Sequence, residues 1–441
     1  MKDAFRNRGD MIQKKEKETA KRLAAYIKES PTAYHAVAAG IKRLAAAGFA
    51  EWSPLAAEAV KPGAKFWYSP YPTCLFAFVI GGKVGGLKLA GAHTDSPCFH
   101  IKPNPDSPQQ LYLRLNTDIY GGPIHNSWLD RPLSIAGSVA LRDKDSAVPR
   151  LELVDLKAPV LTIPNLAIHM NREANKGHEW NPQTELLPLL GMKAEKDKDA
   201  GFMKFLAKKL KVKAEDILDF DLFVYNTEDA LFQGMNEEFL SAPRLDNLTS
   251  CFALIEAMTK LEDADGINVI ALYDNEEIGS LTARGADSRT LPMLLENIYE
   301  ALGKSRSEMN ADILAGTLLS VDVAHALHPN FVGKNDPTNF ALMNEGVVFK
   351  LNSNQKYINN LETLARLELL CEKEEIPYKK YVNRSDVAGG GTIGNRVASH
   401  LPMCGLDMGV PLLAMHSARE MMGVKDQEAL ERLVREFFAQ F

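Results

Sequence analysis

The chain has 441 residues, which is enough for two domains of ordinary size. Hydrophobic residues make up 46% of it, charged residues make up 24%, and the net charge is -6, as in an average soluble globular protein. Because a nucleic-acid partner would require clustered lysine and arginine, the mild acidic excess argues against such a partner.

The cysteines and the N-terminal segment both bear on the cellular compartment. The cysteines are widely spaced and include no C-x-x-C pair: Cys74, Cys98, Cys251, Cys371 and Cys404. We expect buried free thiols in a reducing compartment and no thiolate metal site. Segment 1–23 lacks the apolar core of a signal peptide, and the sequence has no run of about 18 apolar residues. A cytoplasmic protein without a membrane partner is therefore expected.

The first hundred or so residues predict two helices followed by two strands. Apolar residues recur at helical spacing over 16–48, and Ser30 followed by Pro31 predicts a new helix start, since serine caps helices and proline fits the first turn. The apolar runs 75–80 and 86–90 flank a glycine turn and predict strands, the second leading into His93.

The pattern of apolar and polar residues changes at about residue 99 and again at about residue 241. Alternating apolar residues broken by Gly, Pro and Asp-Lys-Asp turns predict an inserted β-rich domain over 99–240, with one solvated amphipathic helix over 203–213. Residues 1–98 and 241–441 predict the two parts of an α/β domain. Its later elements are a helix over 248–261, a strand over 267–273, a helix over 291–301 and a strand over 314–321.

Acidic and histidine residues follow several of these apolar runs at the point where each run ends. Ligands in open α/β sheets bind outside the carboxyl ends of the strands, and a carboxylate just before a helix also gains from the helix dipole. We therefore expect the following residues to converge in one crevice: His93, Asp246, Glu276, Glu277, Asp322 and His416.

Two histidines with several carboxylates and no cysteine form a nitrogen and oxygen ligand set that suits zinc, with manganese or cobalt as alternatives. Two such ions would share a carboxylate and activate a water between them. Neighbouring residues on an extended segment point in opposite directions, so one of Glu276 and Glu277 should bind metal and the other should act as general base. Asp95 is expected to fix the tautomer of His93, and His325, if its segment is helical, to stabilise charge on a carbonyl oxygen.

Each of these features alone has an ordinary structural explanation. Most acidic runs are solvated turns, and strand ends lead into polar loops in any protein. The set of strand-end residues taken together favours a site. The glycine run 389–391 predicts either backbone that approaches a substrate or a plain turn into a helix, and it lacks the pattern of a nucleotide-binding loop.

Five sequence motifs resemble those of the aspartyl aminopeptidase family of two-metal peptidases. They are HTDSP at 93–97, SAPRLDN at 241–247, DNEEIGS at 274–280, SVDVAH at 320–325 and MHSARE at 415–420. The resemblance implies a zinc-aminopeptidase-like mixed sheet flanked by helices, and hydrolysis of the N-terminal residue from peptides.

The resemblance also implies a role for each site residue. Asp246 would bridge two divalent ions, Glu277 and His416 would complete one ion, and His93 and Asp322 the other. Glu276 would be the general base, Asp95 would orient His93, and His325 would contact substrate.

Two further residues concern assembly and selectivity. His169 is implied to reach into a neighbouring subunit's site within a tetrahedral homododecamer, whose dimer contacts come from the inserted domain. Lys350 resembles the family lysine that faces an acidic first residue, so Asp or Glu at the peptide N-terminus is favoured, although the sequence departs from the family over 385–390. A preference for neutral residues, hydrolysis of non-peptide amides, and a non-enzymatic assembly protein that retains the fold stay open as alternatives.

Overall fold

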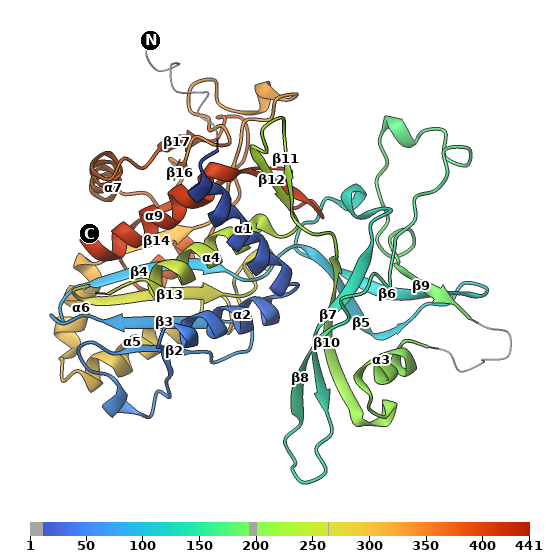
Figure 1. The fold of residues 1–441 in the computed structure, drawn as a ribbon, viewed down its shortest axis with the longest axis horizontal. Helices are drawn as coiled ribbons and strands as arrows, with labels where there is room; N and C mark the ends of the chain where they lie inside the picture. The colour runs from blue at the N-terminus through green and yellow to red at the C-terminus, as the bar shows by residue number, and fades with distance from the viewer. Residues whose placement is uncertain (1–11, 194–200, 263) are drawn as a thin grey trace.

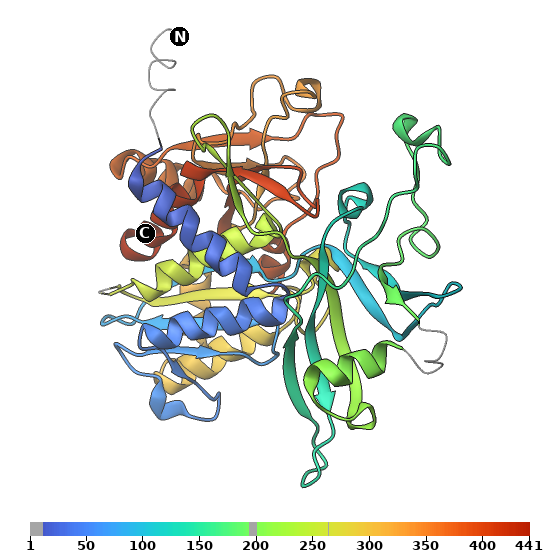
Figure 2. The same ribbon diagram turned by 45° about the vertical axis from the view of Figure 1, so that its right-hand side comes forward.

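The computed structural model describes residues 12–193, 201–262 and 264–441; residues 1–11, which bear on the expected lack of a signal peptide, lie outside the described residues. A helix-covered sheet lies beside a smaller β-rich unit (Figure 1, Figure 2). The predicted α/β class with an inserted β-rich region is confirmed. None of the helices within the described ranges combines the length and the hydropathy that a membrane span requires.

The larger sheet has nine strands, and its central strands are parallel. β13, β4, β14 and β18 are neighbours and run in the same direction, so their carboxyl ends lie at one edge of the sheet. In spatial order the strands are β1 (Ala50–Glu51), β2 (Lys65–Tyr68), β3 (Leu75–Ile80), β13 (Ile267–Tyr273), β4 (Leu87–His93), β14 (Thr317–Val321), β18 (Cys404–Gly409), β16 (Val347–Leu351) and β17 (Tyr378–Val382).

Helices cover both faces of this sheet. One hydrophobic cluster includes α1 (Lys14–Glu29), α2 (Ala33–Ala46), α4 (Leu245–Thr259), α7 (Leu361–Lys373) and α9 (Val424–Gln440). A second cluster includes α5 (Thr290–Ala301), α6 (Arg306–Ala315) and α8 (Ile393–His400). β3 contributes alternate residues to the two clusters, because successive side chains of a strand point to opposite faces.

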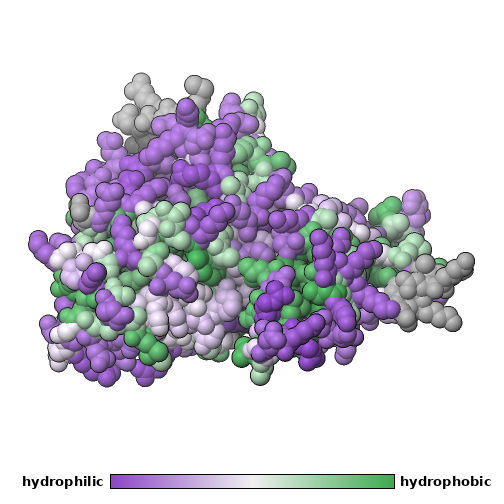
Figure 3. Space-filling view, turned by 60° about the horizontal axis from the view of Figure 1, so that its bottom comes forward, coloured by the Kyte–Doolittle hydropathy of each residue, from purple (hydrophilic) through white to green (hydrophobic). Residues whose placement is uncertain are grey.

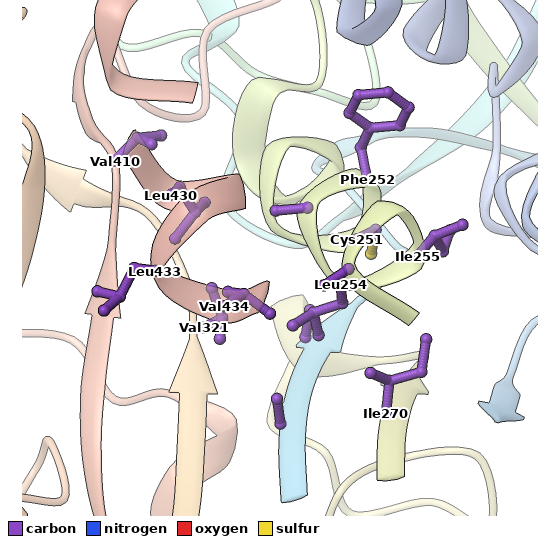
Figure 4. Close-up of a cluster of buried hydrophobic side chains, with 14 of the residues drawn as sticks. Cys251, Phe252, Leu254, Ile255, Ile270, Val321, Val410, Leu430, Leu433 and Val434 are labelled. Carbon is purple, nitrogen blue, oxygen red and sulfur yellow. The ribbon is translucent and has the colours of Figure 1, made fainter. Parts of the chain in front are cut away.

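The close-up in Figure 4 shows part of the first cluster. Leu254 of α4 and Leu430 of α9 lie over the sheet, which contributes Ile270 of β13 and Val321 of β14. All four side chains are fully buried, so β13 and β14, which lead to the candidates Glu276 and Asp322, belong to a rigid core.

The smaller unit is a six-stranded antiparallel sheet whose strands all come from the interval 98–226. In spatial order they are β8 (Arg150–Asp155), β7 (Leu133–Leu141), β10 (Ile217–Asn226), β5 (Cys98–Asp106), β6 (Tyr112–Tyr120) and β9 (Leu189–Met192). The helix predicted over 203–213 is α3 (Phe202–Leu210), which ends earlier because Lys211 adopts a left-handed conformation. Phe202 and Leu206 of α3 are fully buried in the core of this unit.

A five-stranded sheet joins distant parts of the chain next to the large sheet. Its order is β11 (Leu231–Gln233), β12 (Phe239–Ala242), β20 (Glu420–Gly423), β19 (Pro411–Leu413) and β15 (Ala324–His325). β12 precedes Asp246, β19 precedes His416, and β15 contains His325. This sheet therefore brings three site candidates together from segments that are far apart in sequence.

Two local predictions from the sequence are wrong. The strand predicted over 314–321 begins only at Thr317, because 306–315 form α6, a helix that the sequence reading missed despite a capping box between Ser305 and Glu308. By contrast, Asp246 falls within the bounds of α4, but it and Asn247 have non-helical backbone angles, so the regular helix begins after them, as predicted. All the cysteines are free as expected, but Cys404 is exposed and Cys98 is only partly buried.

Candidate active site

The carboxyl ends of the parallel strands open into one pocket. β4 ends at His93, which is paired with Tyr273 at the end of β13, and β14 is followed directly by Asp322. The pocket has a volume of about 210 Å³. Its walls include His93, Asp246, Glu276, Glu277, Asp322, His325, Lys350, Gly390, Gly391 and His416.

Two groups of ligand atoms overlap at Asp246. His93 Nε2 lies 3.3 Å from Asp246 Oδ1 and 3.6 Å from Asp322 Oδ1. On the other side, His416 Nε2 lies 3.5 Å from Asp246 Oδ2 and 3.4 Å from Glu277 Oε2. Within each group the ligand atoms lie within 4.8 Å of one another. Each carboxylate oxygen of Asp246 thus faces a different histidine.

The chemistry of these groups fits divalent cations. Asp246 Oδ1 is buried and has no hydrogen-bond partner among the described residues, although His93 Nε2 faces it. Burial alone would lower a histidine pKa, yet the surrounding carboxylates raise the pKa of His93 well above its usual range, and Asp246 raises the pKa of His416 to about 9. A strongly negative, buried set of nitrogen and oxygen donors is the environment in which zinc binds.

Glu276 and Glu277 occupy a short 3-10 turn, η5 (Glu276–Ile278), instead of the extended segment predicted from the sequence. The turn begins after Asn275, which has a left-handed φ of 61°. The two carboxylates nevertheless differ in their contacts. Glu277 faces His416, whereas the Glu276 carboxylate has no hydrogen bond or ion pair among the described residues. Burial and the neighbouring carboxylates raise the pKa of Glu276 to about 7.

Asp95 lies beside His93, as the sequence predicts. His93 Nδ1 is 3.1 Å from the backbone oxygen of Asp95 and 3.3 Å from its Oδ1. The carboxylate also accepts the backbone N–H groups of Glu276 (3.2 Å) and Glu277 (3.1 Å). Asp95 therefore links the end of β4 to the acidic turn that follows β13.

Of the remaining candidates, Lys350 and His325 line the pocket and His169 does not. Lys350 is buried, and its Nζ donates to the backbone oxygen of Val323 at 3.1 Å and lies 3.5 Å from Asp322 Oδ2. His325 lines the pocket from the short strand β15, so it reaches the site without the helical segment on which the sequence argument was conditional. His169 is exposed on a loop and does not line the pocket of its own chain.

Sequence reasoning misses Glu420, although this residue ends the motif at 415–420. The buried carboxylate of Glu420 accepts the backbone N–H of Asp246 at 3.0 Å and that of His416 at 2.8 Å. Burial raises the pKa of Glu420 to about 8. Its spacing of four residues from His416 was the available signal, but the contact with Asp246 depends on the pairing of β20 with β12.

Comparison with known proteins identifies the family. A family model described as aminopeptidase I zinc metalloprotease (M18) matches residues 26–438. The chain belongs to the M18 family of zinc aminopeptidases. The resemblance to aspartyl aminopeptidases that the motifs indicate is confirmed at the level of the M18 family.

Individual M18 relatives match along almost the whole chain. A probable M18 family aminopeptidase 2 of Clostridium novyi (strain NT) is 42% identical over 424 residues, which cover 95% of this chain and 98% of the relative. The cryo-EM structure of the Ape4 and Nbr1 complex contains a chain with a TM-score of 0.93 at 33% identity, covering 98% of this chain and 87% of that one. The S. cerevisiae mApe1 dodecamer has a TM-score of 0.83 at 26% identity, covering 96% and 97%. The M18 fold is therefore shared over both units.

Proposed function

We propose that this M18 chain is a two-metal aminopeptidase that removes the N-terminal residue from peptides. The observation that carries the proposal is the pair of ligand groups that share Asp246. One group contains His93, Asp246 and Asp322; the other contains Asp246, Glu277 and His416. The family description favours zinc, and manganese or cobalt would suit the same donors.

The metal ions and the residues around these groups would each have a separate role in peptide hydrolysis. Two divalent cations held there would polarise the scissile carbonyl and lower the pKa of a water molecule. Glu276, whose carboxylate is unengaged by other described residues, would take the proton of that water and return it to the leaving amine. Asp95 holds His93 through Nδ1 and leaves Nε2 facing Asp246. His325 would stabilise negative charge on the carbonyl oxygen.

We propose further that the first residue of the substrate is preferentially Asp or Glu. The support is Lys350, a buried cation in the wall of the same pocket, which could form a charge-assisted hydrogen bond to a substrate carboxylate. Because Lys350 already lies 3.5 Å from Asp322, a preference for neutral first residues is the alternative.

One experiment tests activity, metal and selectivity together. Otherwise identical peptides beginning with Asp, Glu, Leu or Ala are incubated with the protein, with chelator, and with re-added zinc, manganese or cobalt. We expect loss of hydrolysis in chelator, recovery with metal, and the highest kcat/KM for Asp or Glu. Faster cleavage of Leu would contradict the role of Lys350. No cleavage of any peptide under any condition would favour the non-enzymatic alternative, or an amidohydrolase if a non-peptide amide added to the same assay were cleaved.

We propose that the chain assembles into a tetrahedral homododecamer in which the six-stranded unit, within the insertion 99–240, makes the dimer contacts. Leu151 and Leu153 on the edge strand β8 are exposed, and an exposed apolar edge strand is a site where another chain can pack. On the face of the molecule that Figure 3 shows, hydrophobic patches lie among hydrophilic surface. His169 lies between exposed apolar residues, Ile168 and Met170, as expected for a loop that becomes buried on assembly. In this proposal His169 completes the pocket of a neighbouring subunit.

A further inference from the structure

Segment 120–124, at the end of β6, leaves the six-stranded sheet and runs beside the metal ligands. The Tyr120 hydroxyl donates a hydrogen bond to Asp95 Oδ2 at 2.7 Å and accepts one from Asn275 Nδ2 at 3.0 Å. The Tyr120 ring packs edge-on against Phe223 of β10, with the ring centroids 5.8 Å apart. The Tyr120 side chain is therefore held from both sides, its ring by its own sheet and its hydroxyl by the larger unit that contains the pocket.

The partner of Tyr120 supports several parts of the site at once. Asp95 contacts His93 Nδ1 and accepts the backbone N–H groups of Glu276 and Glu277. The bond from Tyr120 is the shortest of the hydrogen bonds to this carboxylate, as expected when a hydroxyl donates to a charged acceptor. A shift of Asp95 would therefore move a histidine ligand and the acidic turn together.

The same segment also contacts the other ligand group. The backbone oxygen of Gly122 lies 3.0 Å from His416 Nδ1, and the backbone N–H of Ile124 donates to the backbone oxygen of His416 at 2.9 Å. Gly121 has a φ of 70°, and a Cβ at this position would lie 3.1 Å from Cβ of Glu277. The backbone here approaches the site more closely than other residue types would allow.

We propose that Tyr120 is a positioning residue of the metal site, which fastens Asp95 to the six-stranded sheet and so sets the geometry of both ligand groups. The inference rests on the proposed two-metal function. Removal of an outer partner of a metal-binding histidine typically costs about 10- to 100-fold in metal affinity or activity. The hydroxyl of Tyr120 acts through Asp95, so its loss should have an effect of this kind without removing any ligand.

The test is Tyr120→Phe in the full-length protein, compared with Tyr34→Phe. The Tyr34 hydroxyl donates to Asp221 Oδ2 at 2.5 Å, so the control also removes a tyrosine–aspartate bond between a helix of the catalytic domain and the six-stranded sheet. Zinc affinity is measured by competition with a chromophoric chelator, and kcat and KM with a peptide substrate. We expect Tyr120→Phe to lose about 10- to 100-fold in zinc affinity or kcat with KM little changed, and Tyr34→Phe to match wild type. Equal behaviour of the two variants would overturn the proposal.

A double-mutant cycle with Asp95→Asn shows whether Tyr120 acts through Asp95. If it does, the losses in Tyr120→Phe and Asp95→Asn should not add, because both interrupt the same contact. Additive losses would overturn the proposal. Failure of the proposed function would be seen differently, as wild-type protein that binds no zinc or hydrolyses no peptide. If only the inference about Tyr120 fails, the wild-type protein still binds zinc and hydrolyses peptide.

Discussion

His93 and Asp246 face each other across the floor of the pocket, with Nε2 and Oδ1 3.3 Å apart and both side chains almost fully buried. Asp246 is also the residue that the two ligand groups share. We predict that Asp246→Asn loses bound zinc at both positions and that its kcat/KM falls by more than about 100-fold. Loss of a residue that only contacts a ligand costs up to about 100-fold, and loss of a ligand itself should cost more. Elemental analysis of metal per subunit, with peptide kinetics, checks this.

The six-stranded sheet offers a matched control for Asp246→Asn. Asp221 Oδ1 is 2.8 Å from His100 Nε2, so Asp221→Asn disturbs a similar aspartate–histidine pair outside the pocket. This variant should keep its zinc and its activity. If Asp246→Asn retained metal as well as Asp221→Asn does, the shared-ligand assignment would be wrong.

Glu420 should stabilise the folded site through backbone contacts. In Glu420→Ala the buried N–H group of Asp246 and the part-buried N–H group of His416 lose their acceptor, and a buried donor left unsatisfied costs about 1–3 kcal/mol. We expect a lower free energy of unfolding in urea and weaker zinc binding. Glu420→Gln keeps one acceptor oxygen and should be intermediate. Wild-type stability in Glu420→Ala would show that the two hydrogen bonds contribute nothing.

Lys350 should set the preference for the first residue of the peptide. Loss of a charge-assisted hydrogen bond, about 1.5–3 kcal/mol, predicts that Lys350→Met lowers kcat/KM for Asp and Glu peptides by about 10- to 100-fold and affects Leu and Ala peptides less. The control is Lys379→Met, which removes a lysine on β17, the strand next to that of Lys350, where it pairs with Glu345. An equal loss for all four peptides would instead assign Lys350 to the support of Asp322.

His169 should act on a neighbouring subunit. His169→Ala and Glu276→Gln subunits should each be nearly inactive alone, yet coassembly in equal amounts should restore activity. About a quarter of the sites in random mixed oligomers would then pair an intact Glu276 with an intact donor of His169. Native mass spectrometry confirms mixing. Mixed oligomers without recovered activity would contradict this role.

The sequence predicted the parts of the site that depend on local pattern. The strand over 267–273 has the predicted bounds, and His93 and Asp322 lie at strand ends as expected, because periodicity and strand length determine such positions. The contact of Glu420 with Asp246 and that of Tyr120 with Asn275 are not predictable from local pattern, because each joins residues more than a hundred positions apart. The 3-10 turn at Glu276 follows Asn275 in a left-handed conformation, which the apolar pattern does not indicate. The role of His169 stays a prediction, since it concerns a second chain.

In the proposed mechanism the carboxylates have separate roles: Glu276 transfers protons, and Asp246, Glu277 and Asp322 bind metal. Glu276→Gln keeps the size of the side chain and removes its basic oxygen. The decisive measurement is kcat for an N-terminal Asp peptide together with zinc content per subunit. We predict unchanged zinc content and a loss of about 100- to 10,000-fold in kcat, the range for removal of a general base. Hydrolysis by Glu276→Gln at the wild-type rate, with zinc bound, would contradict the mechanism.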